Sequence, residues 1–480
     1  MAEPTLAQQL ASFASDVARD GAPEDVSRSV IQRVIDVLGL AVAAQALPTS
    51  QAAMAYAEEI GGRPQAHAVG VATALPAPAA AFVNGVLAHS LDYDDTHLPS
   101  VLHPSANIVP AALAAAEEAG ADGESLVRAV AVGLEVAVRL GMAGYDESIG
   151  NSVYFEHGQH ATSICGAMGA AVSAGMLLRL DRDELVHVLG LAASMASGIL
   201  EANRTGGTVK RLHCGWAAQA GVQAAHLVRR GFTGPPTVLE GRFGFFESWL
   251  HGSTVDLAAV TDGLGTQWSV PGIFFKPYPA NHFTHAAVDA GMELRAQGVQ
   301  PADIRRLELG VAAAPLRTIG QPIETKRAPE TGYQAQFSGP YALVAGLLGG
   351  SGLGVGLADY TDELARDPQR RALMELVDVV ADPRCGEIFP HQFPAIVRAE
   401  LADGSERVVE VLANRGGPQR PLSDDELAVK FRENVADRLD AQVLEVVERD
   451  LRDLRALGSV TTVMEQFARA SSTHQPQPTR

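Results

Sequence analysis

Apolar residues return at helical spacing along the first half of the chain. Between residues 25 and 44, valine and leucine side chains recur every three or four positions, which is typical of a buried helix face. Residues 124–140 repeat this spacing, and Glu135 and Arg139 stand four residues apart there, as a helix-stabilising ion pair requires. Further helices are predicted at residues 161–178, 182–200 and 213–230. Residues 1–268 are therefore predicted to form an all-helical region.

The pattern changes after Trp268. Residues 271–279 are predicted to form a loop, and residues 305–313 and 376–381 carry strand signals. Segments 395–401 and 407–412 alternate apolar and polar residues around Asp403-Gly404, which is a strong hairpin signal. We therefore predict a smaller α/β region over residues 269–412.

A helical pattern returns in the segment PLSDDELAVKFRENV, where Ser423 and Glu426 form a capping-box motif. Residues 413–480 either form a third domain or pack back onto the first helices. We prefer the second reading, because so short a segment makes a poor independent core. The final residues, SSTHQPQPTR, are predicted to be a frayed tail. The predicted fold is mainly α, with a large discontinuous helical domain and a smaller α/β domain.

Composition narrows the classes of function. Aromatic residues make up only 5% of the 480 residues, while alanine and glycine are abundant, which favours closely packed helices. The formal net charge of −19 argues against a nucleic-acid surface or an anionic membrane as partner. Only four residues are lysines, against 33 arginines, so Lys210 and Lys276 are of interest as compact ammonium groups.

The location of the protein is predicted from the cysteines and from what the sequence lacks. The longest apolar run, near residues 164–178, is too short to span a bilayer, and the first residues do not resemble a secretory signal. Cys165, Cys214 and Cys385 lie far apart and form no CxxC motif. We expect reduced thiols and a cytoplasmic location.

The segment AHSLDYDDTHLPSVLHPS gathers three histidines and three aspartates. A metal site could draw on them, but the segment has no HExxH motif, calcium loop or His-x-His spacing, so no metal is predicted. A second reading has its aspartates cap helices. A third has Asp92, Thr96 and His103 line a cleft, where an aspartate that orients a histidine supports proton transfer. In that reading the remaining members are helix caps and surrounding shell: Asp94, Asp95, His89 and His97.

Four other polar segments carry candidate residues. In YFEHGQHATSICG, His157 and His160 precede an apolar helix and either cap it or favour a nearby anion. In NRTGGTVKRLHCG, the pair Gly206-Gly207 before Lys210 and His213 resembles an anion cradle.

The other two segments follow residue 270. In GIFFKPYPANHFTH, Lys276 lies between apolar residues and prolines, and is either a site residue or a surface lysine with a buried stem. In AQFSGPYALVAGLL, Ser338 is predicted to cap a helix with Tyr341 in its first turn. That tyrosine either donates to an anionic intermediate or simply packs.

These segments supply Lys210, Lys276, His103 and His160 as possible cations in an acidic chain. A local focus of positive charge suits a small polycarboxylate substrate, and the expected chemistry is proton transfer next to a carboxylate. We consider three classes of function: a lyase that removes water or CO₂, an epimerase or isomerase, and a carboxylate-binding protein without catalysis.

Several motifs in order resemble the MmgE/PrpD family: HSLDYDDTH…HPS, His160-Ala161-Thr162, GTVKRLHCG, FKPYPAN, FSGPYA and GGPQRPLSDDELAVKFR. The family includes 2-methylcitrate dehydratases, cis-aconitate decarboxylases and an iminodisuccinate epimerase. The resemblance implies a helical domain with an α/β lid, an active site between them, a homodimer in solution, and no metal or organic cofactor.

The resemblance also implies site residues. The decarboxylase site of the family falls, motif by motif, on Asp92, Thr96, His103, His160, Lys210, Lys276 and Tyr341. His213 joins the two lysines as a predicted substrate-binding residue. The loop LPSVL lacks the tryptophan-rich spacing of the dehydratases and is closer to the decarboxylase and epimerase branch. The arrangement of His282 and His285 in PYPANHFTH points to no subfamily.

Overall fold

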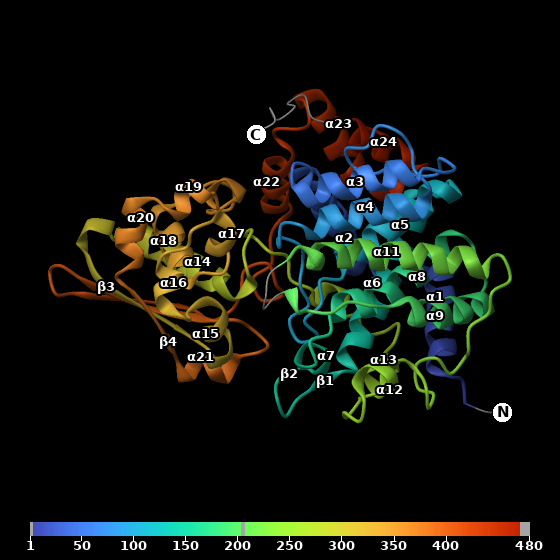
Figure 1. Ribbon diagram of the computed structural model, residues 1–480, viewed down its shortest axis with the longest axis horizontal. Helices are drawn as coiled ribbons and strands as arrows, with labels where there is room; N and C mark the ends of the chain where they lie inside the picture. Colours follow the sequence, from blue (N-terminus) through green and yellow to red (C-terminus); the bar gives the residue numbers. More distant parts are fainter. Residues whose placement is uncertain (1–2, 203–206, 471–480) are drawn as a thin grey trace. The chain divides into compact units, whose positions relative to one another are not determined.

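The computed structural model describes residues 3–202 and 207–470 (Figure 1). The chain divides into two compact units, which we call the helical unit (residues 1–273 and 434–480) and the α/β unit (residues 274–433). The predicted boundaries are residues 268 and 412, so the first differs slightly and the second differs by most of a helix and the loop before it. The reason is that residues after 412 bond to the α/β unit: the amide of Phe275 donates to Gly416, and Arg420 pairs with Asp289 at 2.9 Å. The predicted tail, residues 471–480, lies outside the described residues.

The helical unit contains most of the helices. They are α1 (Leu6–Asp20), α2 (Glu24–Ala44), α3 (Pro48–Ile60), α4 (Ala77–His89), α5 (Ser105–Ala119), α6 (Gly123–Met142), α7 (Val153–Glu156), α8 (Ala161–Leu177), α9 (Arg182–Met195), α11 (Val209–Val228), α12 (Phe245–Leu250), α13 (Ala258–Thr261), η1 (Val270–Gly272), α23 (Ala441–Arg452), η5 (Leu454–Ala456) and α24 (Thr461–Arg469). A short antiparallel pair, β1 (Tyr145–Asp146) and β2 (Asn151–Ser152), precedes α7.

Helix α8 forms the centre of the helical unit and packs against α5, α6, α9 and α11 (Figure 1). Every residue of α8 except Met176 is buried, so its Ala- and Gly-rich sequence needs no polar face. Close approach depends on glycine: a Cβ added at Gly169 would lie 2.3 Å from the carbonyl oxygen of Gly133 on α6. Similarly, a Cβ at Gly215 on α11 would lie 2.4 Å from the carbonyl oxygen of Phe82 on α4. The small residues therefore set the spacing of the helices.

Two predicted helix ends differ from the structure, and both differences concern the site. Helix α9 ends at Met195 rather than at residue 200, because Ala196 is extended and Gly198 has a φ of +138°. Residues 198–200 instead pair with residues 158–160: the amide of His160 donates to Gly198, and that of Leu200 to Gly158. Helix α11 begins at Val209, so Lys210 and His213 lie three residues apart in its first turn.

The C-terminal helices return to the helical unit. Helix α23 packs against α2, and the amide of Gly123 at the start of α6 donates to Leu457. The amide of Gly70 donates to Phe467 in α24. These contacts agree with the reading in which the final helices pack back onto the first ones. Helix α22 (Asp424–Val435) precedes them and opens with the predicted capping box between Ser423 and Glu426.

The α/β unit is built on a four-stranded sheet in the order β4-β3-β5-β6. Strands β3 and β4 are parallel, and the other neighbouring pairs are antiparallel. Its elements are η2 (His282–Thr284), α14 (His285–Ala296), η3 (Pro301–Asp303), β3 (Ile304–Val311), α15 (Ala313–Ile319), α16 (Ile323–Arg327), α17 (Gly332–Ala335), α18 (Gly339–Leu348), η4 (Leu357–Asp359), α19 (Asp362–Ala365), α20 (Pro368–Met374), β4 (Val377–Ala381), α21 (Pro383–Ile388), β5 (Ala395–Leu401) and β6 (Glu406–Val411). Helices α14 and α18 pack on each other and contribute to the core beside the sheet.

The strand predictions agree closely with this sheet, and the β5–β6 hairpin turns at the predicted Asp403-Gly404, where Gly404 has a φ of +83°. A large helical part with a small α/β part confirms the predicted fold class.

Membrane-spanning potential is limited to one combination of helices. Within residues 3–202 and 207–470, no single helix is both long and apolar enough to cross a bilayer. Helices α2 and α3 pass that test only together, and they are bent by 97° at their junction.

A buried ion pair fixes the loop between α4 and α5. Arg33 on α2 is 1% exposed, and its guanidinium bonds the carboxylate of Asp95 at 2.6 Å. The same guanidinium donates to the carbonyl oxygens of Val270 and Ile273, at 3.2 and 2.8 Å. The Asp95 carboxylate also accepts bonds from the hydroxyl and amide of Ser105, at the start of α5. This network joins α2, α5, the loop and residues 270–273.

Replacing Arg33 with methionine should destabilise the protein strongly, because it leaves the Asp95 carboxylate buried without its cation. We expect a loss of about 3–5 kcal/mol, read from the urea unfolding midpoint. The matched control is Arg128→Met, whose partner Glu124 is 28% exposed, and which should cost no more than about 1 kcal/mol. Equal, small shifts for both variants would contradict this account.

Candidate active site

The segment AHSLDYDDTHLPSVLHPS spans the end of α4, a compact loop and the start of α5. Asp92 and Val101 have φ values of +52° and +55°, and left-handed backbone of this kind reverses the chain twice within the loop. Backbone bonds between His97 and Leu102 close the loop on itself. Thr96 and His103 are thereby brought together, with Thr96 Oγ1 3.3 Å from His103 Nδ1.

His103 is held in one tautomer. Its Nδ1 lies 2.8 Å from the carbonyl oxygen of Asp95, and a carbonyl can only accept, so Nδ1 carries the hydrogen. In the neutral ring Nε2 then keeps its lone pair and can accept a proton. The backbone amide of His103 also donates to Thr162 Oγ1 on α8, at 3.1 Å. The side chain is 12% exposed, so the ring is within reach of a small ligand.

Asp92, the aspartate expected to orient His103, lies beside a lysine. Asp92 Oδ1 lies 3.8 Å from Lys210 Nζ, across the space between the loop and α11. The Asp94 carboxylate also lies near His103: its Oδ2 lies 3.9 Å from His103 Nδ1 and 2.7 Å from His89 Nδ1. The Asp95 carbonyl and the Asp94 carboxylate are therefore placed to orient His103, and a role of Asp92 in orienting the same ring stays a prediction.

His160 and His213 form a second pair. His160 is the N-cap residue of α8, and its Nδ1 lies 2.8 Å from Nδ1 of His213 on α11. The hydroxyl of Ser163 donates to the carbonyl of His213 at 3.1 Å, which ties the two helix starts together. His157, by contrast, is exposed.

Both rings of this pair are neutral near pH 7. Burial, followed by the charges of His89 and Lys210, holds the pKa of His160 well below its usual range. The same causes lower the pKa of His213 to about 4. The sequence analysis counted His160 among the cations, and burial overturns that expectation. Lys210, whose side chain is 26% exposed, supplies positive charge at this place.

Four imidazoles lie in one continuous array. Ring centroids are 5.3 Å apart for His89 and His103, 5.7 Å for His89 and His160, and 4.9 Å for His160 and His213. The structure thus brings together six predicted residues of the helical unit: Asp92, Thr96, His103, His160, Lys210 and His213. It adds His89 and Asp94, which the sequence analysis assigned to the surrounding shell. The sequence HSLDYDD does not by itself predict that His89 and Asp94 meet, because their contact depends on the left-handed backbone at Asp92.

Two predicted residues belong to the α/β unit, and Lys276 is one of them. Its side chain is 1% exposed, which excludes the surface-lysine reading. The loop that carries Lys276 packs closely against the GGPQRP segment. Glycine is required there, because a Cβ at Gly416 would lie 2.1 Å from the carbonyl oxygen of Phe275. A Cβ at Gly417 would lie 1.9 Å from the ring of Phe274. Two of the motifs noted in the sequence therefore pack directly on each other.

Tyr341 is the other residue of the α/β unit. Ser338 caps α18 as predicted, and the ring of Tyr341 is fully buried in the core of the unit. Its hydroxyl donates to the carbonyl oxygen of Asp359, and Arg370 lies 5.5 Å from the ring centroid. Burial raises the pKa of Tyr341 to about 12, so the hydroxyl keeps its proton. This geometry favours the packing role over donation to an intermediate.

Three further features of the described residues concern metal-binding groups, the cysteines and the glycine pair. Among residues 3–202 and 207–470, no group of three His, Cys, Asp or Glu side chains is arranged to hold a metal ion. Cys165, Cys214 and Cys385 are buried and free. Gly206 of the expected anion cradle lies outside the described residues, while Gly207 has a φ of +106°.

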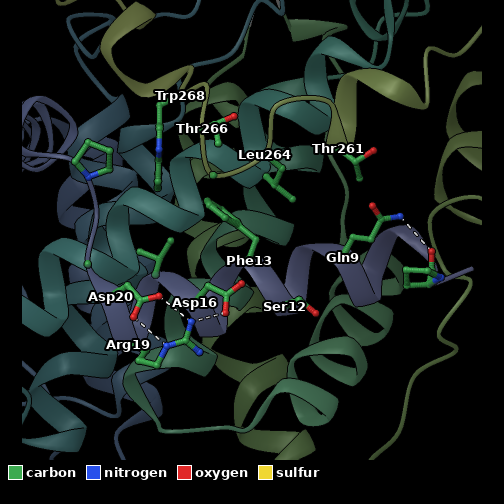
Figure 2. A pocket seen from close by; sticks show the side chains of 15 residues that line it. Gln9, Ser12, Phe13, Asp16, Arg19, Asp20, Thr261, Leu264, Thr266 and Trp268 are labelled. Carbon is green, nitrogen blue, oxygen red and sulfur yellow. Dashed lines mark hydrogen bonds and ion pairs between the residues drawn. The ribbon is translucent and has the colours of Figure 1, made fainter.

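A groove of about 690 Å³ runs along α1 (Figure 2), but it holds none of the predicted site residues. Phe13 and Trp268 line it, with ring centroids 5.3 Å apart. Its two carboxylates, Asp16 and Asp20, are both paired with Arg19, at 2.9 and 2.7 Å. None of the residues that line the groove belongs to the histidine array, so the groove is a separate surface feature.

The low pKa of His213 should make part of the stability depend on pH. An unfolded histidine titrates near 6.5, so below that pH the unfolded chain gains a proton that the folded chain, with a pKa of about 4, does not. The free energy of unfolding should therefore fall as the pH falls, and His213→Gln should lessen the fall between about pH 7 and about pH 5. Urea unfolding at several pH values measures this. An unchanged pH dependence would contradict it, and the exposed His157→Gln serves as control.

The comparisons with known proteins agree with the sequence prediction. Residues 8–258 match the MmgE/PrpD N-terminal domain, and residues 278–453 match the MmgE/PrpD C-terminal domain. Cis-aconitate decarboxylase of Mus musculus is 30% identical over 82% of this chain and 79% of its own length. Cis-aconitate decarboxylase of Aspergillus terreus is 26% identical over 97% of this chain and 96% of its own length. The 2-methylcitrate dehydratase of Salmonella typhimurium is 27% identical over 74% of this chain and 75% of its own length. Since the two domain matches together cover most of its length, the chain belongs to the MmgE/PrpD family.

Proposed function

We propose that this protein is a cofactor-independent lyase that acts on a small tricarboxylate, with loss of CO₂ from cis-aconitate as the first reaction to test. The observation that carries the proposal is the placement of Lys210, His103 and the neutral His160–His213 pair in one array. The family supports a lyase, because its relatives are named as decarboxylases and dehydratases. The decarboxylases match over 82–97% of the chain and the dehydratases over 74–75%, which favours decarboxylation.

In this proposal Lys210 binds a substrate carboxylate. Its ammonium group lies 3.8 Å from Asp92, at a distance where an incoming carboxylate can compete for it or share it. The low pKa of His160 and of His213 leaves both rings uncharged, so they act as hydrogen-bond partners rather than as counter-ions. Thr96, next to His103, can donate to the same substrate. The family resemblance implies Lys276 as a second carboxylate-binding residue.

His103 is the proposed proton-transfer residue. With Nδ1–H bonded to the Asp95 carbonyl, Nε2 is the atom that exchanges a proton with substrate. In a decarboxylation, the bond to CO₂ breaks, its electron pair stays on carbon, and the protonated ring gives that carbon a proton. In a dehydration, the neutral ring takes a proton from the carbon beside the carboxylate, the C–O bond breaks with its electron pair on oxygen, and the protonated ring gives that proton to the leaving hydroxide, which departs as water. Both routes pass through a carbanion or enediolate that cationic groups stabilise.

Proton NMR of purified protein with citrate, 2-methylcitrate, cis-aconitate and iminodisuccinate tests the proposal. His103→Gln and Lys210→Met should lower turnover by about 100- to 10,000-fold, since one removes proton transfer and the other removes charge stabilisation. Arg211→Met is the matched control, because it removes a positive charge from the next position on α11, where Arg211 bonds Thr49. Normal turnover in His103→Gln would contradict the assignment.

The same experiment distinguishes the other classes of function. Solvent deuterium entering unreacted substrate, with no loss of CO₂ or water, would indicate an epimerase. Binding without any product would indicate a carboxylate-binding protein. Because the proposed reaction needs no metal ion, we expect turnover to be unchanged when a chelator is added.

A homodimer in the cytoplasm completes the proposal. The support for the dimer is the family resemblance, and the support for the cytoplasm is the set of free cysteines together with the acidic composition. Light scattering of the purified chain should give twice the monomer mass of 50.3 kDa. A monomer mass at micromolar concentration would overturn the dimer and leave the reaction untouched.

A further inference from the structure

Asp94 is directed at two imidazole rings. Its side chain is 0% exposed, and its Oδ2 lies 2.7 Å from Nδ1 of His89 and 3.9 Å from Nδ1 of His103. His89 is itself buried, with a side chain 1% exposed, and is the last residue of α4. The arrangement is a buried carboxylate that one histidine holds in place beside a second, more accessible histidine.

The neighbouring aspartates have other partners. Asp92 lies beside Lys210, and the carboxylate of Asp95 bonds Arg33 and Ser105. The three aspartates of LDYDD therefore differ in function, although the sequence does not distinguish them. Asp94 lies against the histidine array through its contacts with His89 and His103.

The array needs a negative charge during the proposed reaction. When His103 holds a proton on Nε2, the ring is an imidazolium in a partly buried place next to the buried ring of His89. Positive charge in such surroundings is costly unless a carboxylate balances it. Because Asp94 Oδ2 lies 3.9 Å from His103 Nδ1, it is placed to stabilise the imidazolium, as a buried aspartate does in a catalytic triad.

We propose that Asp94 and His89 form a positioning pair for His103, in which Asp94 stabilises the protonated ring and His89 holds Asp94 through Nδ1–H. The inference rests on the proposed function, because it requires His103 to transfer a proton. Neither residue is assigned to substrate contact.

His89 also offers a competing role that the experiment must separate. Its Nε2 is buried and has no hydrogen-bond partner among the described residues. That nitrogen could instead carry a proton itself. Asparagine places an amide N–H where Nδ1 of histidine lies, whereas glutamine places its amide nearer to Nε2. The two substitutions therefore test the two nitrogens separately.

The experiment measures kcat and KM for wild type, Asp94→Asn, His89→Asn and His89→Gln at one pH. We expect Asp94→Asn and His89→Gln to lower kcat by about 100-fold or more with KM within about threefold, because the interaction forms with the protonated ring and not with substrate. His89→Asn, which keeps the donor to Asp94, should retain kcat within about tenfold of wild type. If Asp94→Asn does not fold, comparison of the two His89 variants still tests whether the Nδ1 donor to Asp94 is required.

Two results would overturn the proposal. One is a kcat for folded Asp94→Asn within about threefold of wild type. The other is a His89→Asn variant as impaired as His89→Gln, or more so, which would assign the role to Nε2. If wild type itself turns over none of the carboxylates, the proposed function has failed, and that failure is distinguished from these two because it needs no variant.

The helical unit offers a matched control. His67 Nδ1 lies 2.7 Å from Glu117 Oε1, and Glu117 is 1% exposed, so this pair has the same chemistry and similar burial of the carboxylate. Glu117→Gln removes the buried carboxylate charge, and His67→Gln removes the Nδ1 donor, so both disrupt a histidine–carboxylate pair outside the histidine array. Their kcat should stay within about threefold of wild type even if their unfolding midpoints fall. A loss of kcat equal to that of Asp94→Asn would show a general structural effect and overturn the proposal.

Discussion

The site depends first on the buried pair of Arg33 and Asp95. Two charges removed from water are tolerated only when each finds several partners, and here each does. Those partners come from α2, α5 and residues 270–273, so the pair cannot form unless all of these segments are in place. The backbone carbonyl of the same Asp95 then accepts the Nδ1–H of His103. Asp95 thus forms the buried ion pair through its carboxylate and fixes the tautomer of His103 through its backbone carbonyl.

Small side chains bring the other imidazoles to this place. At the crossing of α4 and α11, Gly85 and Gly215 let the helix axes approach to a distance that any Cβ would prevent. That crossing carries His89 at the end of α4 and His213 near the start of α11. The Ala- and Gly-rich composition is therefore a condition for the histidine array as well as for dense packing.

Much of the fold could be predicted from the sequence, because hydrophobic period and turn signals act locally. The helices of α2, α6 and α8, the hairpin and the capping box all follow such local rules. The end of α9 could not be predicted from such local rules, because residues 198–200 leave the helix to pair with a distant segment. The candidate site residues of the helical unit lie together in the structure, but the contacts that hold them do not follow from local rules. Arg33 interrupts an apolar stripe on α2, which was a signal, but its partner lies 62 residues away and no local rule connects them.

The assignment of charges could not be predicted either, because burial decides it. His160 looks like a cation in the sequence and is neutral in the structure, while Asp94 looks like one of three equivalent aspartates and faces two rings.

The packing of the Lys276 loop against Gly416 and Gly417 limits which substitutions the two segments can accept. Phe274 and Phe275 are packed against Gly416 and Gly417 so closely that neither glycine has room for a methyl group. The two segments lie about 140 positions apart in the chain, yet they share one volume. A larger residue at position 417 is admissible only together with a smaller one at position 274. The segments around Lys276 and Gly416 should therefore be exchanged between homologous proteins as a pair. Exchange of one segment alone would place it against a partner of the wrong shape.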